Sequence, residues 1–433
     1  MKYYSTNRQV PVATLEEAVV KGLAADKGLF MPETIKPLPQ EFYDTIETLS
    51  FQEIAYRVAD AFFGEDVPAE TLKQIVYDTL NFDVPLVHVK DCIYSLELFH
   101  GPTLAFKDVG GRFMARLLGY FIKKEGQKDV NVLVATSGDT GSAVANGFLG
   151  VEGIHVYVLY PKGKVSEIQE KQFTTLGQNI TALEVDGTFD DCQALVKAAF
   201  MDKELNEHLS LTSANSINVA RFLPQAFYYF YAYAQLKRAG KADNAVICVP
   251  SGNFGNITAG LFGKKMGLPV KRFIAANNRN DIFYQYLQTG KYNPRPSVAT
   301  IANAMDVGDP SNFARVLDLY GGSHADISAE ISGTTYTDEQ IRETVKETWK
   351  EHHYLLDPHG ACGYRALQEG LKQGETGVFL ETAHPAKFLE TVESIIGEAV
   401  EIPAKLQEFM KGEKKSLQMT KEFADFKKYL LSV

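Results

Sequence analysis

The sequence predicts an α/β fold in which parallel sheets are covered by helices, preceded by a mostly helical N-terminal unit. From residue 130 onward, short β-branched runs alternate with longer amphipathic stretches, which is the pattern of parallel strands with helices on both faces of a sheet. The chain has 433 residues, more than one hydrophobic core usually serves, so we expect two or three packed units. Hydrophobic residues make up 45% and charged residues 23% of the chain, as in ordinary globular domains.

The first 95 residues differ from the rest because their helical patterns are separated by loops that contain proline and glycine. Apolar residues recur at helical spacing in three stretches, Leu15–Gly22, Ser50–Phe63 and Ala69–Leu80. We therefore predict an N-terminal domain over residues 1–95 and a second region over residues 96–433. Within that region we expect a smaller αβ subdomain at about residues 125–215 and a larger αβ domain formed by the remainder.

The predicted strands are short, mostly apolar and bounded by turn residues, as buried strands of a parallel sheet should be. They are Asn131–Ala135, His155–Leu159, Ile180–Val185, Ala245–Val249, Arg272–Ala275 and Gly377–Glu381. The stretch Asp108–Lys123 carries Phe113, Leu117 and Phe121 at a spacing of four. That spacing gives one apolar stripe, which predicts a helix packed on a sheet.

Composition argues against several classes of function. The net charge of −10 disfavours general binding of nucleic acids, because a phosphate backbone requires a concentrated basic face. No run approaches the roughly 18 apolar residues that cross a bilayer, and residues 1–10 lack the apolar core of a signal peptide, so we expect a cytoplasmic protein. The four cysteines show no CxxC spacing, which predicts reduced core residues and no disulfide or metal site.

Two predicted strands run into polar, glycine-containing turns that are followed by helices. The first turn is Thr136–Gly141 (TSGDTG) and the second is Ser251–Asn256 (SGNFGN). Such turns can hold a phosphate, because glycine lets the backbone approach an anion and the first N–H groups of the helix point at it. Each could instead be a tight turn with Ser or Asp as a helix cap. Neither matches GxGxxG or GxxxxGK[ST], so a small phosphorylated cofactor or substrate fits better than a nucleotide.

A lysine stands at the start of the predicted amphipathic helix, in the segment HGPTLAFKD at 100–108. Partial burial and the positive end of the helix both favour the neutral amine of Lys107, which is the form that attacks a carbonyl carbon. A surface lysine at a helix start is the ordinary alternative. Because two phosphate-type turns occur in the same chain, we predict a lysine that forms a Schiff base.

Five motifs stand in the order in which they occur in the threonine synthase family: HGPTLAFKD, TSGDTG, SANSINVARFLPQ, PSGNFGN and ETAHPAKF. The segments AADKGLFMPE near the N-terminus and AMDVGDPSN at 304–312 also resemble that family. The resemblance implies a fold-type II pyridoxal-phosphate enzyme, with two αβ domains and the cofactor in the cleft between them.

The resemblance also implies which residues hold the cofactor. Lys107 matches the Schiff-base lysine, and Thr382 matches the hydroxyl partner of the pyridine nitrogen, with a threonine that caps the turn after a strand as the alternative. Asp139 matches a polar position beside the cofactor's 3′-oxygen where many relatives have Asn, so whether it donates or accepts a hydrogen bond stays open. The loop that binds the cofactor phosphate through backbone N–H groups matches Gly252, Asn253, Phe254, Gly255 and Asn256.

The phosphate of the substrate needs a second anion site, for which the resemblance suggests Ser216, Asn218 and Arg221. These residues combine hydroxyl and amide donors with a guanidinium fork. A helix that starts near Ile217 would place Asn218 and Arg221 on one face. Two further residues match positions near the substrate carboxylate or the cofactor, namely Ser137 and Thr140.

Four side chains near these motifs have open roles: His100, Lys164, Gln225 and His384. We assign no general-base role to either histidine, because the Schiff-base lysine can itself carry the protons and a hydrogen-bonded scaffold histidine is an adequate explanation. Gln225 lies four residues after Arg221 and can face the site or solvent. Lys164 can contact a phosphate or be a hydrated surface lysine.

The implied reaction converts O-phospho-L-homoserine and water to L-threonine and phosphate by γ-elimination and β-addition. A threonine or serine dehydratase of the same fold type is one alternative, and it would not need a phosphate site at Arg221. A noncatalytic protein that binds a small anion or cofactor is another, and it would not need Lys107. The expected partner is a small-molecule substrate, with no nucleic acid and no membrane, and the long N-terminal extension is compatible with a monomer.

Overall fold

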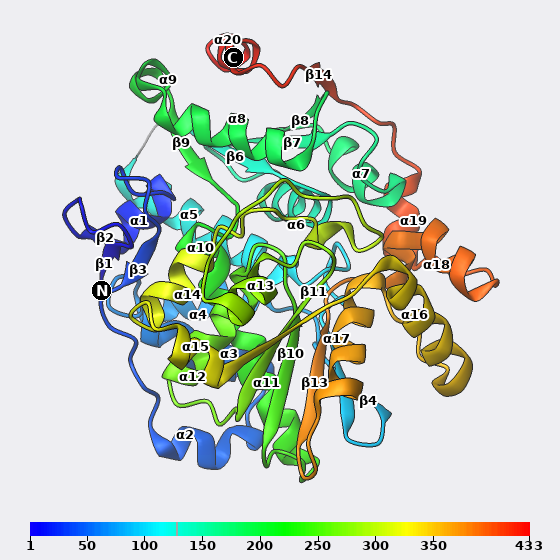
Figure 1. Ribbon diagram of the computed structural model, residues 1–433. Helices are drawn as coiled ribbons and strands as arrows, with labels where there is room; N and C mark the ends of the chain where they lie inside the picture. Colours follow the sequence, from blue (N-terminus) through cyan, green and yellow to red (C-terminus); the bar gives the residue numbers. More distant parts are fainter. Residues whose placement is uncertain (127–128) are drawn as a thin grey trace. The chain divides into compact units, whose positions relative to one another are not determined.

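The computed structural model describes residues 1–126 and 129–433 (Figure 1). The described residues form two compact units. The first unit contains Met1, Pro32–Phe106 and Phe222–Glu401. The second unit contains Lys2–Met31, Lys107–Arg221 and Ile402–Val433. The predicted N-terminal domain 1–95 therefore supplies residues to both units, and its boundaries stay a prediction.

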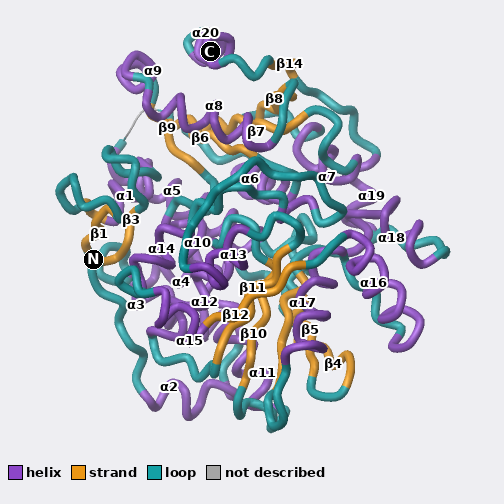
Figure 2. Tube along the Cα trace, in the orientation of Figure 1, coloured by secondary structure: helices purple, strands orange, loops and turns teal. Residues whose placement is uncertain are grey.

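The first unit is built on a six-stranded sheet with the order β12-β11-β10-β13-β5-β4, and Figure 2 shows its strands in orange. The strands are β4 (Leu86–Lys90), β5 (Ile93–Glu97), β10 (Ala245–Pro250), β11 (Arg272–Asn277), β12 (Ile331–Thr335) and β13 (Thr376–Glu381). All neighbouring pairs are parallel except β4 and β5. The carboxyl ends of the parallel strands therefore lie at one edge of the sheet, where ligands bind in folds of this kind.

Helices surround this sheet. They are α2 (Gln40–Thr45), α3 (Phe51–Phe63), α4 (Ala69–Thr79), α11 (Ala226–Arg238), α12 (Gly255–Lys265), α13 (Ile282–Thr289), α14 (Phe313–Leu319), α15 (His324–Glu330), α16 (Asp338–His352), α17 (Pro358–Gly370) and α18 (Leu389–Ile396). Several begin with a side-chain cap that satisfies the first N–H groups. In α3 the hydroxyl of Ser50 accepts from the N–H of Glu53, and the Glu53 carboxylate accepts in return from the N–H of Ser50.

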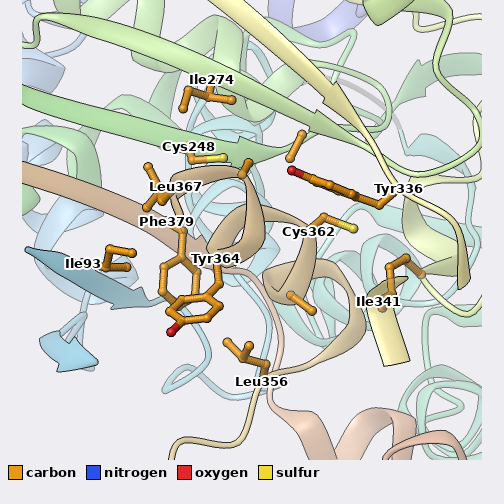
Figure 3. Close-up of a cluster of buried hydrophobic side chains, with 14 of the residues drawn as sticks. Ile93, Cys248, Ile274, Tyr336, Ile341, Leu356, Cys362, Tyr364, Leu367 and Phe379 are labelled. Carbon is orange, nitrogen blue, oxygen red and sulfur yellow. The ribbon is translucent and has the colours of Figure 1, made fainter. Parts of the chain in front are cut away.

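The core of the first unit lies where α17 packs on the sheet. Figure 3 shows Leu367 close to Cys248 and Phe379, Tyr364 beside Phe379, and Cys362 near Tyr336 in the same buried cluster. Tyr364 and Phe379 meet edge to face, with ring centroids 5.6 Å apart. Burial raises the pKa of the Cys248 and Cys362 thiols, so both remain protonated, as structural cysteines do. The cysteines are all free, and only Cys92 among them is not fully buried.

The second unit contains a five-stranded parallel sheet with the order β14-β8-β7-β6-β9. Its strands are β6 (Val130–Ala135), β7 (Ile154–Pro161), β8 (Ile180–Val185), β9 (Ser210–Ser213) and β14 (Leu417–Met419). Near the N-terminus a small sheet contains β1 (Lys2–Ser5), β2 (Ala13–Thr14) and β3 (Phe30–Pro32). The helices are α1 (Leu15–Lys21), α5 (Lys107–Glu125), α6 (Asp139–Phe148), α7 (Glu167–Thr174), α8 (Phe189–Met201), α9 (Lys203–His208), α10 (Val219–Phe222), α19 (Ala404–Met410) and α20 (Phe423–Leu430).

The predicted fold class is confirmed, because two parallel-sheet units and N-terminal helices are present. Each of the six predicted strands occurs, most of them one to three residues longer than expected. Among the strands that the pattern did not predict, β5, β9 and β12 contain serine, threonine or glycine that interrupts the apolar run. No helix in the described part of the chain has both the length and the apolar composition needed to span a membrane.

The helix that the sequence predicted to start near Ile217 starts two residues later. It begins at Val219 and ends at Phe222 as α10, because the amide oxygen of Asn218 accepts from the N–H of Ala220 at 3.0 Å and caps the first turn. A 3-10 turn with Pro224 at its second position follows at Leu223–Gln225, since proline cannot donate to the preceding turn.

Candidate active site

The predicted lysine is the first residue of α5, and the segment before it is firmly anchored. Lys107 itself is half-buried. The N–H of Phe106 donates to the carbonyl of Thr382 at 2.8 Å, and Ala105 pairs with Ala383 in an isolated antiparallel bridge. This attachment fixes the end of the segment that leads into α5.

The same anchored segment carries backbone strain. Leu104 has a φ of 57°, an unfavourable conformation for a branched side chain. It is held there because its carbonyl accepts from the N–H of His384 at 3.0 Å. The buried Lys387 donates from Nζ to the carbonyl of Thr103 at 2.8 Å. Strain of this kind persists where the surroundings over-determine the backbone, as they do at functional loops.

The second glycine turn and Thr382 lie at the same edge of the six-stranded sheet. Strands β10 and β13 are parallel neighbours, with Cys248 opposite Phe379. The turn Ser251–Asn256 follows β10, and Thr382 follows β13 directly. The structure thus brings the predicted phosphate loop and the predicted partner of the pyridine nitrogen together within the first unit.

The backbone of this turn is open to an anion. Among the described residues, no hydrogen bond is donated by the N–H groups of Gly252–Asn256. The turn leads into α12, whose first N–H groups point the same way. Phe254 has a φ of 66°, a left-handed conformation that reverses the chain at the helix start. A Cβ on Gly252 would lie 2.7 Å from the carbonyl oxygen of Ala304, so only glycine fits there.

Two side-chain atoms in the turn are buried and have no hydrogen-bond partner among the described residues: Asn253 Oδ1 and Asn256 Nδ2. The orientation of the Asn256 amide is set by Tyr228 and Tyr229, whose hydroxyls both lie 2.7 Å from Asn256 Oδ1. Buried polar atoms are normally paired. Open backbone N–H groups together with a buried amide donor fit a phosphate group such as that of pyridoxal phosphate.

The first glycine turn, in the second unit, is closed on itself. The hydroxyl of Thr136 accepts from the N–H groups of Gly138 at 2.9 Å and Gly141 at 2.8 Å. Ser137 and Thr140 are half-buried on this turn. With two of its N–H groups satisfied internally, the turn presents side chains more than backbone to a ligand.

Asp139 begins α6 and is buried. Its Oδ1 accepts from Nε2 of Gln169 at 2.9 Å. The amide of Gln169 is oriented by the capping box of α7, in which its Oε1 accepts from the N–H of Ser166 at 3.4 Å. Asp139 therefore accepts at least one hydrogen bond, from the Gln169 amide. Gln169 was not predicted as a site residue, although the Ser-x-x-Gln capping pattern was visible in the sequence.

Arg221 is fully buried, and its Nε donates to the carbonyl of Ala214 at 2.7 Å. A Cβ on Gly110 would lie 2.4 Å from Nη1 of Arg221, so the guanidinium lies directly against α5 at that point. Because Gly110 is three residues after Lys107, both share one face of α5. The structure therefore brings Arg221 to the face of α5 that carries Lys107.

Asn218 contacts the backbone of its own unit. Its Nδ2 donates to the carbonyls of Val19 at 2.9 Å and Ser213 at 3.1 Å. Since both amide hydrogens are used in this way, the side chain stabilises the loop between β9 and α10. Ser216 is half-buried on that loop. Binding of a substrate phosphate by Ser216 and Asn218 stays a prediction.

The four residues with open roles lie in different surroundings. His384 accepts from the N–H of Ala386 at its Nδ1, at 3.0 Å, and burial together with the nearby His100 lowers the pKa of His384 to about 4. It is therefore neutral near neutral pH and caps the turn after β13. His100 Nε2 lies 3.3 Å from Glu97. Gln225 is buried and Lys164 is exposed.

Family models cover almost the whole chain. A model described as pyridoxal-phosphate dependent enzyme matches residues 82–382. Models described as threonine synthase N terminus and threonine synthase, C-terminal match residues 2–80 and 360–430.

Individual relatives agree with these models. The chain is 46% identical to threonine synthase of Haemophilus influenzae over 431 residues, which is 100% of both chains. The crystal structure of threonine synthase from Escherichia coli has a TM-score of 0.94 and 44% identity and covers 100% of both chains. An X-ray structure of pyridoxal-phosphate-bound threonine synthase from Brucella melitensis has a TM-score of 0.91 and 36% identity and covers 99% of this chain and 98% of that one.

Proposed function

The chain belongs to the threonine synthase family, and on that premise we propose which of its residues perform each part of the reaction. The enzyme is a pyridoxal-phosphate-dependent lyase that converts O-phospho-L-homoserine and water to L-threonine and phosphate. When bound, the cofactor supplies a conjugated ring that delocalises the electron pair left behind when a proton is removed from the substrate.

Four groups would hold the cofactor. Lys107 would bind it covalently through Nζ, and the turn Gly252–Asn256 would bind its phosphate through backbone N–H groups and the Asn256 amide. Thr382 would be the hydroxyl partner of the ring nitrogen, and Asp139 would be the polar partner of the ring oxygen. The support for this assignment is the open backbone of the turn, the buried amide nitrogen of Asn256 and the position of Thr382 at the same sheet edge.

Lys107 is the proposed proton carrier. With substrate bound, the free Nζ amine would remove protons from Cα and Cβ and return protons to Cγ and Cα. The position of Lys107 at the start of α5 supports this role, because the helix dipole disfavours a charged ammonium there. No other base is required, and the neutral His384 is already engaged as a cap.

Arg221 is the proposed anchor of the substrate phosphate, with Ser216 and Asn218 as lesser contributors and with Ser137 and Thr140 near the carboxylate. The observation that carries this proposal is the contact of the Arg221 guanidinium with Gly110, on the Lys107 face of α5. A guanidinium fork held there binds the phosphate of a substrate attached near Lys107 and keeps the leaving group in place while the Cγ–O bond breaks.

The test is Arg221→Leu, with Arg342→Leu as a control at a side chain whose contact with Ser394 is exposed. We expect Arg221→Leu to lower kcat/KM for phosphohomoserine by roughly a hundredfold or more, measured as coupled release of phosphate and threonine, while the absorbance of bound cofactor persists. Unchanged turnover of phosphohomoserine, together with efficient deamination of threonine, would instead identify a dehydratase.

We further propose that the enzyme acts in the cytoplasm as a monomer and without nucleic acid, and that its N-terminal domain spans residues 1–95. The net charge of −10 disfavours nucleic acid, and the family model for the N terminus ends at residue 80. Light scattering of the purified enzyme measures the molar mass directly, and a mass twice that of the chain would contradict the monomer.

A further inference from the structure

A buried chain of polar groups runs through the first unit from the end of β13 toward the loop around Ala304. It starts at Glu381, the last residue of β13, whose Oε1 accepts from the N–H of Asp357 at 2.6 Å. The Asp357 carboxylate caps α17 by accepting from the N–H of Gly360 at 2.7 Å. Glu381 and Asp357 are both fully buried, and burial beside Asp357 raises the pKa of Glu381.

The next member is His359, which is also buried. Its Nδ1 lies 2.5 Å from Asp357 Oδ2, and its Nε2 lies 3.1 Å from the backbone nitrogen of Ala304. A backbone N–H can only donate, so Nε2 carries no proton and accepts. The proton of the neutral ring is therefore on Nδ1 and faces the Asp357 carboxylate.

The backbone of Ala304 packs directly against the turn Gly252–Asn256, which we call the phosphate turn. A Cβ on Gly252 would lie 2.7 Å from the carbonyl oxygen of Ala304 and 3.1 Å from Cα of Met305. The turn has a second brace, because the N–H of Asn312 donates to the carbonyl of Asn253 at 3.1 Å. A displacement of Ala304 would change the backbone that Gly252 contacts and with it the direction of the N–H groups in the turn.

We propose that His359 is a positioning residue for the phosphate turn Gly252–Asn256, acting through Ala304. It does not touch the cofactor. Its acceptor at Nε2 holds the Ala304 segment at the distance from Gly252 at which the open N–H groups meet a phosphate, and Asp357 keeps the ring in the tautomer that can accept. This inference rests on the proposed assignment of the turn to the cofactor phosphate.

Two substitutions separate the two hydrogen bonds of the ring. In His359→Asn the short amide keeps a donor toward Asp357 but provides no acceptor for Ala304, whereas in His359→Gln the longer side chain reaches Ala304 with its oxygen. The binding constants of pyridoxal phosphate and of pyridoxal, which lacks the phosphate, are measured on apoenzyme by the absorbance of the bound aldehyde. His155→Asn, at a half-exposed histidine of the second unit, is the matched control.

We expect His359→Asn to weaken binding of pyridoxal phosphate by roughly tenfold, the effect of leaving one buried N–H without an acceptor, while pyridoxal binding changes little. His359→Gln should retain most of the affinity, and His155→Asn all of it. Equal losses for both aldehydes would overturn the inference, because they would indicate a general effect on folding. Unchanged binding of pyridoxal phosphate by His359→Asn would overturn it as well.

Failure of the underlying assignment gives a different result. Asn256→Leu removes the buried amide donor from the turn itself and should reduce the preference for pyridoxal phosphate over pyridoxal. If Asn256→Leu leaves that preference unchanged, the turn does not bind the phosphate and the proposed cofactor site is wrong. If Asn256→Leu reduces the preference and His359→Asn does not, the turn is assigned correctly and only the role of His359 is wrong.

Discussion

The two glycine turns follow parallel strands and look alike in sequence, but they use their backbone N–H groups differently. In Thr136–Gly141 the Thr136 hydroxyl accepts from two N–H groups of its own turn. In Ser251–Asn256 the Ser251 hydroxyl turns back to the carbonyl of Val249 at 2.9 Å, and the N–H groups that follow donate no hydrogen bond within the described chain. The Thr136 hydroxyl thus occupies N–H groups of its own turn, whereas the Ser251 hydroxyl leaves the N–H groups of its turn open to a phosphate.

The two turns also need glycine for different reasons. Gly138 has a φ of 143°, a conformation that a side chain disfavours whatever the space around it. Gly252 needs glycine because Ala304 approaches closely. At Gly138 the local backbone requires glycine, and the side chain of Gln169 is also close. At Gly252 the requirement comes from a backbone segment far away in the sequence.

The largest expected effect is that of Gly252→Ala. Its methyl group would lie 2.7 Å from the carbonyl oxygen of Ala304, so either the turn or the backbone at Ala304 must move. We expect the affinity for pyridoxal phosphate to fall roughly a hundredfold, about 2.7 kcal/mol. Gly370→Ala is the control, since its nearest neighbour would lie 3.6 Å away. Titration of apoenzyme with the cofactor measures both, and equal affinities would show that the turn is not the phosphate site.

Thr136→Val tests the other turn. The substitution keeps the shape of the side chain but leaves the N–H groups of Gly138 and Gly141 without their acceptor. We expect the free energy of unfolding to fall by about 2 kcal/mol, while cofactor affinity stays within about threefold of the wild type. Chemical denaturation measures the free energy of unfolding, and cofactor titration measures the affinity. A large loss of cofactor affinity with little loss of stability would reverse the proposed roles of the two turns.

Gly110→Ala tests whether the second unit supplies the substrate's anion site. The added methyl group would meet the backbone carbonyl oxygen of Arg221 as well as Nη1 of its guanidinium, so it would displace both the side chain and the backbone at Arg221. We expect KM for phosphohomoserine to rise roughly tenfold, about 1.4 kcal/mol, with cofactor affinity unchanged. In the same helix, Gly119→Ala has its nearest neighbour at 3.5 Å and should alter neither constant. A rise in KM for both variants would point to a general effect on α5.

The smallest expected effect is the contribution of His384 to the pH dependence of the free energy of unfolding. His384 lies just after β13, in the segment that anchors Leu104. The pKa of His384 is lowered to about 4 in the folded chain, against about 6.5 for an unfolded histidine. Between these values the unfolded chain binds more protons, so the stability that His384 contributes is lost as pH falls. Between pH 7 and pH 5.5 this amounts to about 1 kcal/mol.

His384→Asn keeps an acceptor for the N–H of Ala386 but removes the titrating ring. Its free energy of unfolding should therefore fall less steeply over that range of pH, as urea denaturation at several pH values would show. Identical slopes for the variant and the wild type would mean that His384 is not the group that titrates.

Periodicity and motif order predicted the fold class, while the site residues that they indicated stay a prediction. The strands β6, β10 and β13 were recognisable because they are mostly apolar. β9 was not, since its sequence SLTS reads as polar and its burial depends on packing against α1 and β6. Side-chain contacts between residues far apart in the sequence could not be predicted either.

Gln169 and His359 illustrate the latter limit. Gln169 is a helix capping residue in the sequence, and only the folded α7 places its amide on Asp139. His359 follows Asp357 by two residues, which suggests a local turn, but its second contact is with Ala304, 55 residues away. Helix capping was predictable from local sequence, whereas these long-range contacts required the structure.

The most direct test of the account is to find which lysine carries the cofactor. The purified holoenzyme is reduced with borohydride, digested and analysed by mass spectrometry for the lysine that bears the pyridoxyl group, and an unreduced sample is assayed for release of phosphate and threonine from phosphohomoserine. The account predicts modification at Lys107 and equal amounts of phosphate and threonine. Modification at another lysine, such as the buried Lys387, or an enzyme that takes up no cofactor, would contradict it.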